Sequence, residues 1–140
     1  MDYHALFQVS AAGMATEKLR LDVTALNLAN MHAAAPSANQ VYKPQRVVTQ
    51  AVNFGTQFGR LYGAATGAQA VVVQQDSAPR MVYEPGHPYA NAQGMVAYPG
   101  VDHVAEMVNL NTALRAYEAN VTAMNAARTM AARALDIGGQ

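Results

Sequence analysis

The sequence contains neither cysteine nor tryptophan among its 140 residues. Without cysteine, a disulfide framework and a thiolate metal site are both excluded. Charged residues make up only 13% of the chain and the formal net charge is zero, whereas a nucleic-acid-binding domain usually carries a basic excess. The composition therefore argues against nucleic-acid binding and leaves few titratable groups from which an active site could be built.

Long apolar runs are also lacking. The longest wholly apolar runs are short, such as Ala70–Val73, and fall far below the roughly 20 residues that a membrane-spanning helix needs. A secretory signal is not expected, because Asp2 stands where a positive segment belongs and Glu17 and Lys18 interrupt any apolar core. The sequence predicts a protein without a membrane span, either cytoplasmic or exported without a cleaved signal.

Proline and glycine are concentrated in the middle of the chain. All six prolines lie between residues 36 and 99, and seven of the ten glycines lie between residues 55 and 100. Because both residues disfavour helix interiors, the chain divides into three segments. We expect an N-terminal helix within 1–30, a Pro/Gly-rich middle with short β-strands at 31–100 and a C-terminal helix within 101–140. The predicted fold is mainly α with a small β-containing middle.

The first helix is predicted over Tyr3–Asn30 and carries two apolar stripes with a seven-residue repeat. One stripe includes Val9, Leu19 and Leu26. The other contains Phe7, Met14, Leu21 and Leu28. A helix that buries a single face needs one stripe, so two stripes indicate contact on more than one side.

The last helix is predicted to start at the N-cap residue Asp102 and to end near Gly138 and Gly139. A stripe of small residues, including Ala113, Asn120 and Ala127, runs beside a stripe of large ones. The large stripe consists of Met107, Leu110, Leu114, Tyr117, Val121 and Met124. Sustained heptads in so long a helix favour a coiled coil or a helical assembly.

Four segments of the middle have strand-like composition: Gln40–Val52, Ala70–Gln74, Arg80–Tyr83 and Gly94–Tyr98. Between Asn53 and Gly67 glycine recurs at every fourth residue, and we interpret this segment as a flexible loop.

Candidate chemistry is sparse. The four histidines lack the spacing of a metal site. Asp102, His103 and Glu106 form the nearest approach to an acid–base cluster, but acidic residues are expected at the start of a helix. We therefore predict no catalytic residue, no cofactor and no metal.

Asparagine occupies helical positions where it is unfavourable, notably Asn27, Asn30 and Asn120. A buried asparagine can fix the register of packed helices, and exposure to solvent or termination of the helix is the other interpretation. Termination is favoured at Asn30, and both interpretations remain open at Asn120.

The two ends resemble a known family. The segment Leu19–Asn30 resembles the N-terminal signature of bacterial flagellar rod, hook and hook-associated proteins, whose hallmark is a helix ending in N-x-A-N. The segments Glu106–Leu110 and Arg115–Val121 resemble the matching C-terminal helix. In the middle, Tyr83–Ala90, Gly94–Val96 and Pro99–Asp102 are similar to the proximal rod members of that family.

The resemblance implies a structural subunit of the proximal rod of the flagellar basal body, not an enzyme. Such subunits are exported by the flagellar type III apparatus without a cleaved signal peptide. They assemble in a helical tube that spans the periplasm, transmits torque and forms the wall of the export channel, and their terminal helices pair as a coiled coil.

The expected partners are further copies of the chain, proximal and distal rod proteins and the flagellar export apparatus, without nucleic acid or a small-molecule substrate. The expected assembly interface consists of Phe7, Met14, Leu21, Asn27, Leu28, Asn30, Met107, Leu110, Leu114, Tyr117, Asn120, Val121 and Met124.

Other interpretations stay open on the residues alone. A soluble helical adaptor or secretion chaperone acting as a dimer would show stable, cooperatively melting helices as an isolated protein. An enzyme with a dispersed site would need a ligand pocket in the middle segment. A more distal rod protein is disfavoured by the short middle.

Overall fold

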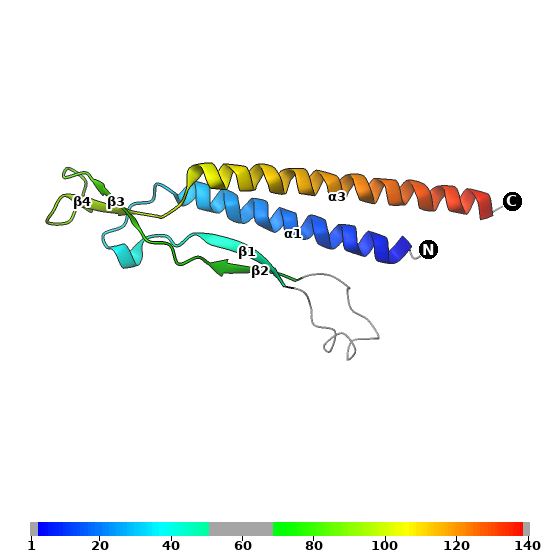
Figure 1. Ribbon diagram of the computed structural model, residues 1–140, viewed down its shortest axis with the longest axis horizontal. Coiled ribbons are helices and arrows are strands. Elements are labelled where there is room, and N and C mark those ends of the chain that lie inside the picture. The colour runs from blue at the N-terminus through cyan, green and yellow to red at the C-terminus, as the bar shows by residue number, and fades with distance from the viewer. Residues whose placement is uncertain (1–2, 51–68, 139–140) are drawn as a thin grey trace, which may run out of the picture. The chain divides into compact units, whose positions relative to one another are not determined.

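The computed structural model describes residues 3–50 and 69–138 (Figure 1). Helix α1 spans Tyr3–Asn30 and helix α3 spans His103–Gly138. Between them lie the 3-10 turn η1 (Ala38–Gln40) and strands β1 (Gln45–Gln50), β2 (Gln69–Gln74), β3 (Arg80–Tyr83) and β4 (Met95–Tyr98). The prediction of a mainly α chain with a small β-containing middle is confirmed.

Both helices begin and end where local signals place them. Helix α1 contains no proline and a single glycine, and it stops at Asn30, ahead of Pro36. Helix α3 follows Asp102, whose Oδ1 accepts hydrogen bonds from the backbone N–H groups of Val104 at 2.9 Å and Ala105 at 3.2 Å. Asp102 is therefore the N-cap, as its side chain and position predict.

The strand predicted over Gln40–Val52 begins later than expected. Residues Ala38–Gln40 form the 3-10 turn, and β1 starts only at Gln45. Pro44 has no N–H to offer a strand ladder and restricts the residue before it, so regular pairing begins after it. The remainder of that strand and the glycine-rich segment between Asn53 and Gly67 lie outside the described residues.

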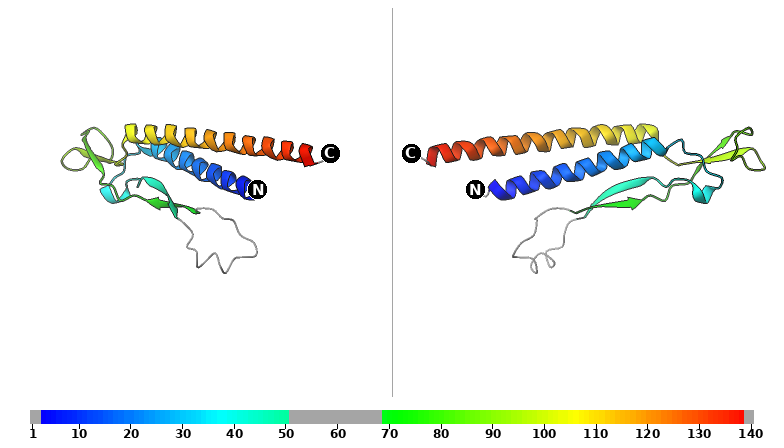
Figure 2. Two further views of the ribbon diagram at one scale, coloured as in Figure 1. Left: turned by 45° about the vertical axis from the view of Figure 1, so that its right-hand side comes forward. Right: turned by 180° about the vertical axis from the view of Figure 1, so that it is seen from behind.

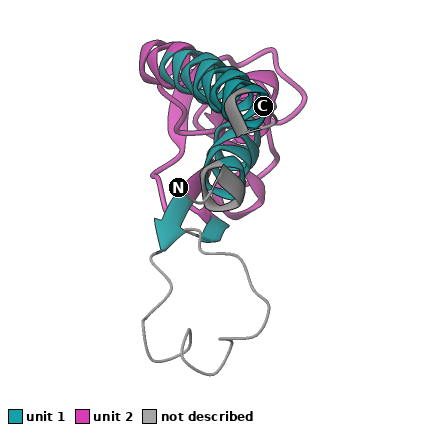
Figure 3. Cartoon of the chain, turned by 90° about the vertical axis from the view of Figure 1, so that its right-hand side faces the viewer, with its two compact units in different colours: residues 1–19, 48–71, 112–140 teal, residues 20–47, 72–111 magenta. Residues whose placement is uncertain are grey.

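The chain forms two compact units (Figure 3). One unit contains residues 1–19, 48–71 and 112–140. The described parts of its two helices lie side by side and run in opposite directions (Figures 1 and 2). They approach closely at Gly13 of α1 and Asn120 of α3.

The other unit contains residues 20–47 and 72–111. Its β-hairpin pairs β3 with β4 in antiparallel register, Arg80 opposite Tyr98 and Tyr83 opposite Met95. A small core forms where Ala35, Val41 and Ala97 meet, and the Ala35 N–H donates to the Ala97 carbonyl at 3.2 Å. This contact ties the segment that follows α1 to the hairpin.

The connection between β3 and β4 is a hydrogen-bonded loop. The Asn91 side chain accepts bonds at 2.9 Å from the backbone N–H groups of Gln93 and Met95. Gly94 has a φ of 74°, and a Cβ there would lie 2.9 Å from the Tyr83 ring. Both the positive φ and the close ring explain why glycine occupies this position.

Strands β1 and β2 form a separate two-stranded sheet. The Gln75 N–H extends this ladder by donating to the Pro44 carbonyl at 2.7 Å. Val48, Val71, Val72 and Val73 are each about two-fifths exposed, at 39–43%. Two strands alone bury little apolar surface. Most of the apolar surface of this sheet can be buried only when another element or another chain packs against it.

Candidate assembly interface

Helix α3 buries part of its small-residue stripe. Ala113 is 3% exposed and Ala127 is fully buried, and Asn120, midway between them, is half-buried. These three positions recur at seven-residue spacing. The large residues of the neighbouring stripe are less covered: Met107 is 47% exposed and Leu114 is 46% exposed.

Helix α1 shows the same arrangement. Its buried residues include the small or polar Ser10, Thr24 and Asn27, whereas Val9 is 58% exposed and Leu26 is 43% exposed. Val23 of α1 is buried as well, at 7% exposure, so burial along these helices is not confined to small side chains. Much of the large apolar surface remains uncovered, which is unusual for residues that a compact domain would bury.

The expected interface residues lie along two helices and not around a cavity. Asn27 is buried and Met107 and Leu114 are exposed. The others are half-buried: Phe7, Met14, Leu21, Leu28 and Asn30 on α1, and Leu110, Tyr117, Asn120, Val121 and Met124 on α3. The assignment of these residues to an interface with another chain remains a prediction.

Gly13 allows the closest helix contact. A Cβ at this position would lie 2.8 Å from Asn120 Oδ1 and 2.9 Å from Asn120 Nδ2. The Asn120 Nδ2 also donates to the Ala116 carbonyl at 3.0 Å. Asn120 thus lies at a helix contact, which is one of the two interpretations that its sequence position allows.

Asn27 is the most enclosed polar side chain of α1, with 1% exposure. Its Nδ2 donates to the Gln45 carbonyl at 2.8 Å, and its Oδ1 accepts from the Gln45 N–H at 2.9 Å and from the Tyr42 hydroxyl at 2.8 Å. Tyr42 and Gln45 are absent from the residues that the sequence singles out. Tyr42 and Gln45 lie 15 and 18 residues after Asn27, so no periodic pattern links them to it. The one feature of the sequence that marks this segment is the neighbouring Pro44.

Asn30 behaves differently. Its Nδ2 donates to the Leu26 carbonyl at 2.8 Å, inside the last turn of α1. The bond joins Asn30 to the turn before it, and α1 ends at this residue.

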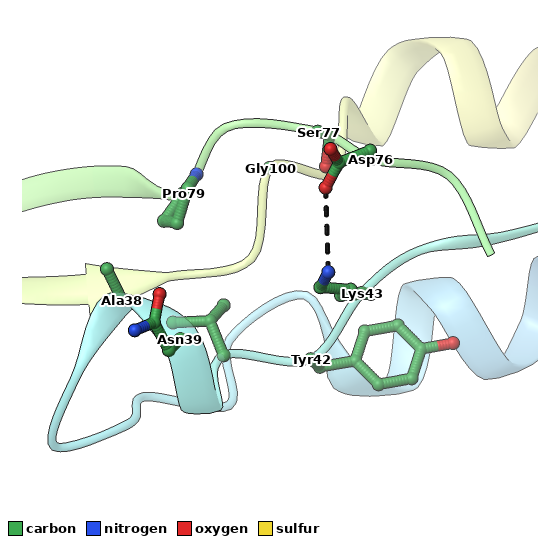
Figure 4. Close-up of a pocket in the computed structure, with 9 residues that line it drawn as sticks. Ala38, Asn39, Tyr42, Lys43, Asp76, Ser77, Pro79 and Gly100 are labelled. Atoms are coloured by element: carbon green, nitrogen blue, oxygen red, sulfur yellow. Dashed lines mark ion pairs between the residues drawn. The ribbon is translucent and has the colours of Figure 1, made fainter.

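A surface pocket of about 350 Å³ lies in the same unit as Asn27 (Figure 4). Its walls come from the segment around Ala38–Lys43, the segment Asp76–Pro79 and Gly100. Lys43 Nζ and Asp76 Oδ1 are 3.5 Å apart, and both side chains are more than half exposed, at 54% and 97%. An exposed ion pair of this kind contributes little stability and supplies no nucleophile with an activating base.

The titratable groups do not form a reactive set. Burial, and then the nearby Glu106 carboxylate, raise the pKa of Tyr42. The hydrogen bond between the Tyr98 hydroxyl and Glu84 Oε2, 3.0 Å long, raises the pKa of Tyr98. Within residues 3–50 and 69–138, no three His, Asp or Glu side chains gather as metal ligands would. Over the same residues, no helix has the length and apolar character needed to cross a membrane.

Helices α1 and α3 both leave large apolar residues exposed, as a subunit does when neighbouring subunits cover that surface. The C-terminal part, residues 92–137, matches the family model described as Flagellar basal body rod FlgEFG protein C-terminal. Residues 92–137 are thus similar to the C-terminal part of flagellar basal body rod proteins.

Relatives that match almost the whole chain show which rod protein family it belongs to. The flagellar basal-body rod protein FlgC of Escherichia coli O6:H1 is 38% identical over 135 residues, covering 95% of this chain and 96% of the relative. The FlgC proteins of Salmonella typhimurium, at 36% over 135 residues, and Bacillus subtilis, at 37% over 147 residues, cover 95% and 97% of this chain. The chain belongs to the FlgC family of flagellar basal-body rod proteins, a structural family without enzymatic activity.

Proposed function

We propose that the chain is a subunit of the flagellar rod that polymerises by packing the large apolar residues of α1 and α3 against neighbouring subunits. One observation carries this proposal. Gly13 of α1 and Asn120 of α3 approach closely inside the chain, whereas Met107 and Leu114 stay nearly half exposed. Contacts between different surfaces of a subunit build an open helical filament when the rotation between neighbours does not close a ring.

Within this proposal the segments 1–30 and 101–140 pair as a coiled coil and form the axial core, with 31–100 outside it. The seven-residue spacing of Ala113, Asn120 and Ala127 supports such pairing, since coiled coils bury one side chain set at that period. The subunits would form a helical tube in the proximal rod that spans the periplasm, transmits torque and encloses the export channel.

The proposed partners are other copies of the chain, further proximal and distal rod proteins, and the flagellar export apparatus. Export would proceed without a cleaved signal peptide. The rod names of the relatives in Escherichia coli and Bacillus subtilis support the rod as the destination.

The proposal predicts that Leu114→Asp prevents rod assembly. A carboxylate buried at a packed interface without a partner costs several kcal/mol at each subunit contact. In a flagellated host that lacks its own copy, the variant should give no swimming halo in soft agar and no band in purified basal bodies. It should still be secreted, because export does not require the assembled contact.

Ala119→Asp is the matched control, since Ala119 is an exposed small residue on the same helix and Arg115 lies one turn before it. This variant should swim. Normal motility and incorporation of the Leu114→Asp variant would refute the proposal.

A further inference from the structure

The Asn27 carboxamide bonds to Gln45 as a neighbouring β-strand would. In a hydrogen-bonded antiparallel pair, one residue donates its N–H to its partner and accepts the partner's N–H in return. Asn27 does the same with its side chain, donating to the Gln45 carbonyl at 2.8 Å and accepting from the Gln45 N–H at 2.9 Å. The end of α1 thereby occupies the edge of β1 where that strand begins.

Residues 31–44, which we name the strap, lead from α1 to β1. The strap is held near its start, at its end, and at Pro44, whose carbonyl accepts from the Gln75 N–H at 2.7 Å. Near its start, the Ala35 N–H donates to the Ala97 carbonyl at 3.2 Å, beside the core of Ala35, Val41 and Ala97. At its end, Tyr42 and Gln45 both bond to Asn27. Val47 is the one buried residue of β1, so the strand is held mainly by the Asn27 bonds and by its ladder with β2.

The chemistry of this attachment requires a neutral amide. Asn27 is 1% exposed, and its three bonds use both a donor and an acceptor of the side chain. A group that lacks the donor leaves the Gln45 carbonyl without its partner, and a buried group without a partner loses much more than the bond itself contributes. A side chain with only apolar atoms leaves the Tyr42 hydroxyl unpaired as well.

We propose that Asn27 is a conformational latch that holds the strap closed and fixes the start of β1 on the end of α1. When the latch opens, residues 41–45 leave α1, while the Ala35–Ala97 bridge and the β3–β4 hairpin keep their structure. The latch acts inside one unit of the chain and does not depend on the assembly of subunits.

Asn27→Asp tests the latch because the substituted side chain can exist in two forms. A protonated carboxyl group has the same hydrogen-bonding set as the amide, an O–H that donates and a carbonyl oxygen that accepts. The ionised carboxylate has no donor and faces the Gln45 carbonyl with a negative charge. The latch should therefore close in acid and open near neutral pH.

The surroundings of residue 27 also favour the protonated form of the introduced carboxyl group. The introduced carboxyl would be buried beside Tyr42, whose pKa is raised by burial and by Glu106 on α3, so Tyr42 stays neutral. Arg46, next to Gln45 on β1, is exposed. Burial and the facing Gln45 carbonyl disfavour the ionised form, so the pKa of the introduced carboxyl is expected above the value of about 3.9 in the unfolded chain. Its contribution is complete below that value and is lost as pH rises through the raised pKa.

The measurement is hydrogen exchange of the Gln45 backbone amide in the full chain, at pH values from about 4 to 8. Compared with the unsubstituted chain at the same pH, Asn27→Asp should speed exchange at neutral pH on the order of tenfold. Protection should return in acid. The backbone amide of Val96 in β4 should exchange equally in both chains at every pH.

Asn30→Asp is the matched control, because it places the same charge in the last turn of α1 but its amide bonds only to the Leu26 carbonyl. It should leave Gln45 unaffected. Tyr42→Phe removes one bond and should give a smaller loss of protection that does not vary with pH. The proposal is wrong if Gln45 stays protected in Asn27→Asp at neutral pH, if acid does not restore protection, or if Asn30→Asp has the same effect.

Discussion

Replacing Gly13 with alanine measures how closely α1 and α3 approach each other. Alanine in place of glycine inside a helix ordinarily stabilises it by about 1 kcal/mol. Here the new Cβ would lie 2.8 Å from Asn120 Oδ1 and 3.0 Å from Asn120 Cγ, distances that require a shift. The Asn120 side chain is the group that must move, and its movement breaks the 3.0 Å bond to the Ala116 carbonyl.

The costs can be compared with the gain. An off-rotamer side chain costs about 0.5–1.5 kcal/mol and a lost hydrogen bond costs about 1 kcal/mol. Gly13→Ala alone should therefore destabilise the chain by about 1 kcal/mol. In the Asn120→Ala background the obstacle is absent, and the same change should stabilise by about 1 kcal/mol. The expected coupling energy between the two positions is thus about 2 kcal/mol.

The assay is a double-mutant cycle on the full chain, with the free energy of unfolding taken from urea titrations followed by helical circular dichroism. Ala15, an exposed residue of α1, supplies the calibration: Ala15→Gly should cost about 1 kcal/mol with or without Asn120. A coupling energy near zero between Gly13 and Asn120 would refute the close approach of the helices at this point.

Two further predictions concern the ends of elements. Asp102→Ala should destabilise the chain by about 1 kcal/mol, because the first N–H groups of α3 lose their acceptor, and Asp102→Asn should retain most of the stability in the same urea titration. Gly94→Ala should destabilise by about 1–2 kcal/mol through its positive φ and the Tyr83 ring, whereas Gly86→Ala, with no atom within 4 Å of a new Cβ, should have no such cost. Equal thermal midpoints for the two glycine variants would contradict this account of the β3–β4 loop.

The elements of the fold were largely predictable because their signals are local. The confinement of proline to residues 36–99 leaves two uninterrupted helical segments, and α1 occupies Tyr3–Asn30 as predicted. The N-cap at Asp102 and the strand Arg80–Tyr83 also lie where their composition places them. The late start of β1 was not foreseen, because the residues before Pro44 have strand-like composition while Pro44 delays regular pairing.

The candidate interface could be predicted only in part from the sequence. The periodicity identified two stripes on each helix, but it carried no information on which stripe the chain buries by itself. Asn27 was singled out as an unusual helical residue, whereas its partners Tyr42 and Gln45 were not. A contact across 18 residues of irregular chain leaves no periodic signal.

The sequence by itself therefore determined the helical ends, the β-containing middle and, through its motifs, the family. These follow from propensities, caps and side-chain order along the chain, all of which act between near neighbours. The tertiary structure decided which residues meet: Gly13 against Asn120, and the Asn27 amide against Gln45 of β1. Those choices depend on steric fit and on the pairing of buried polar groups between distant segments, which no local pattern specifies.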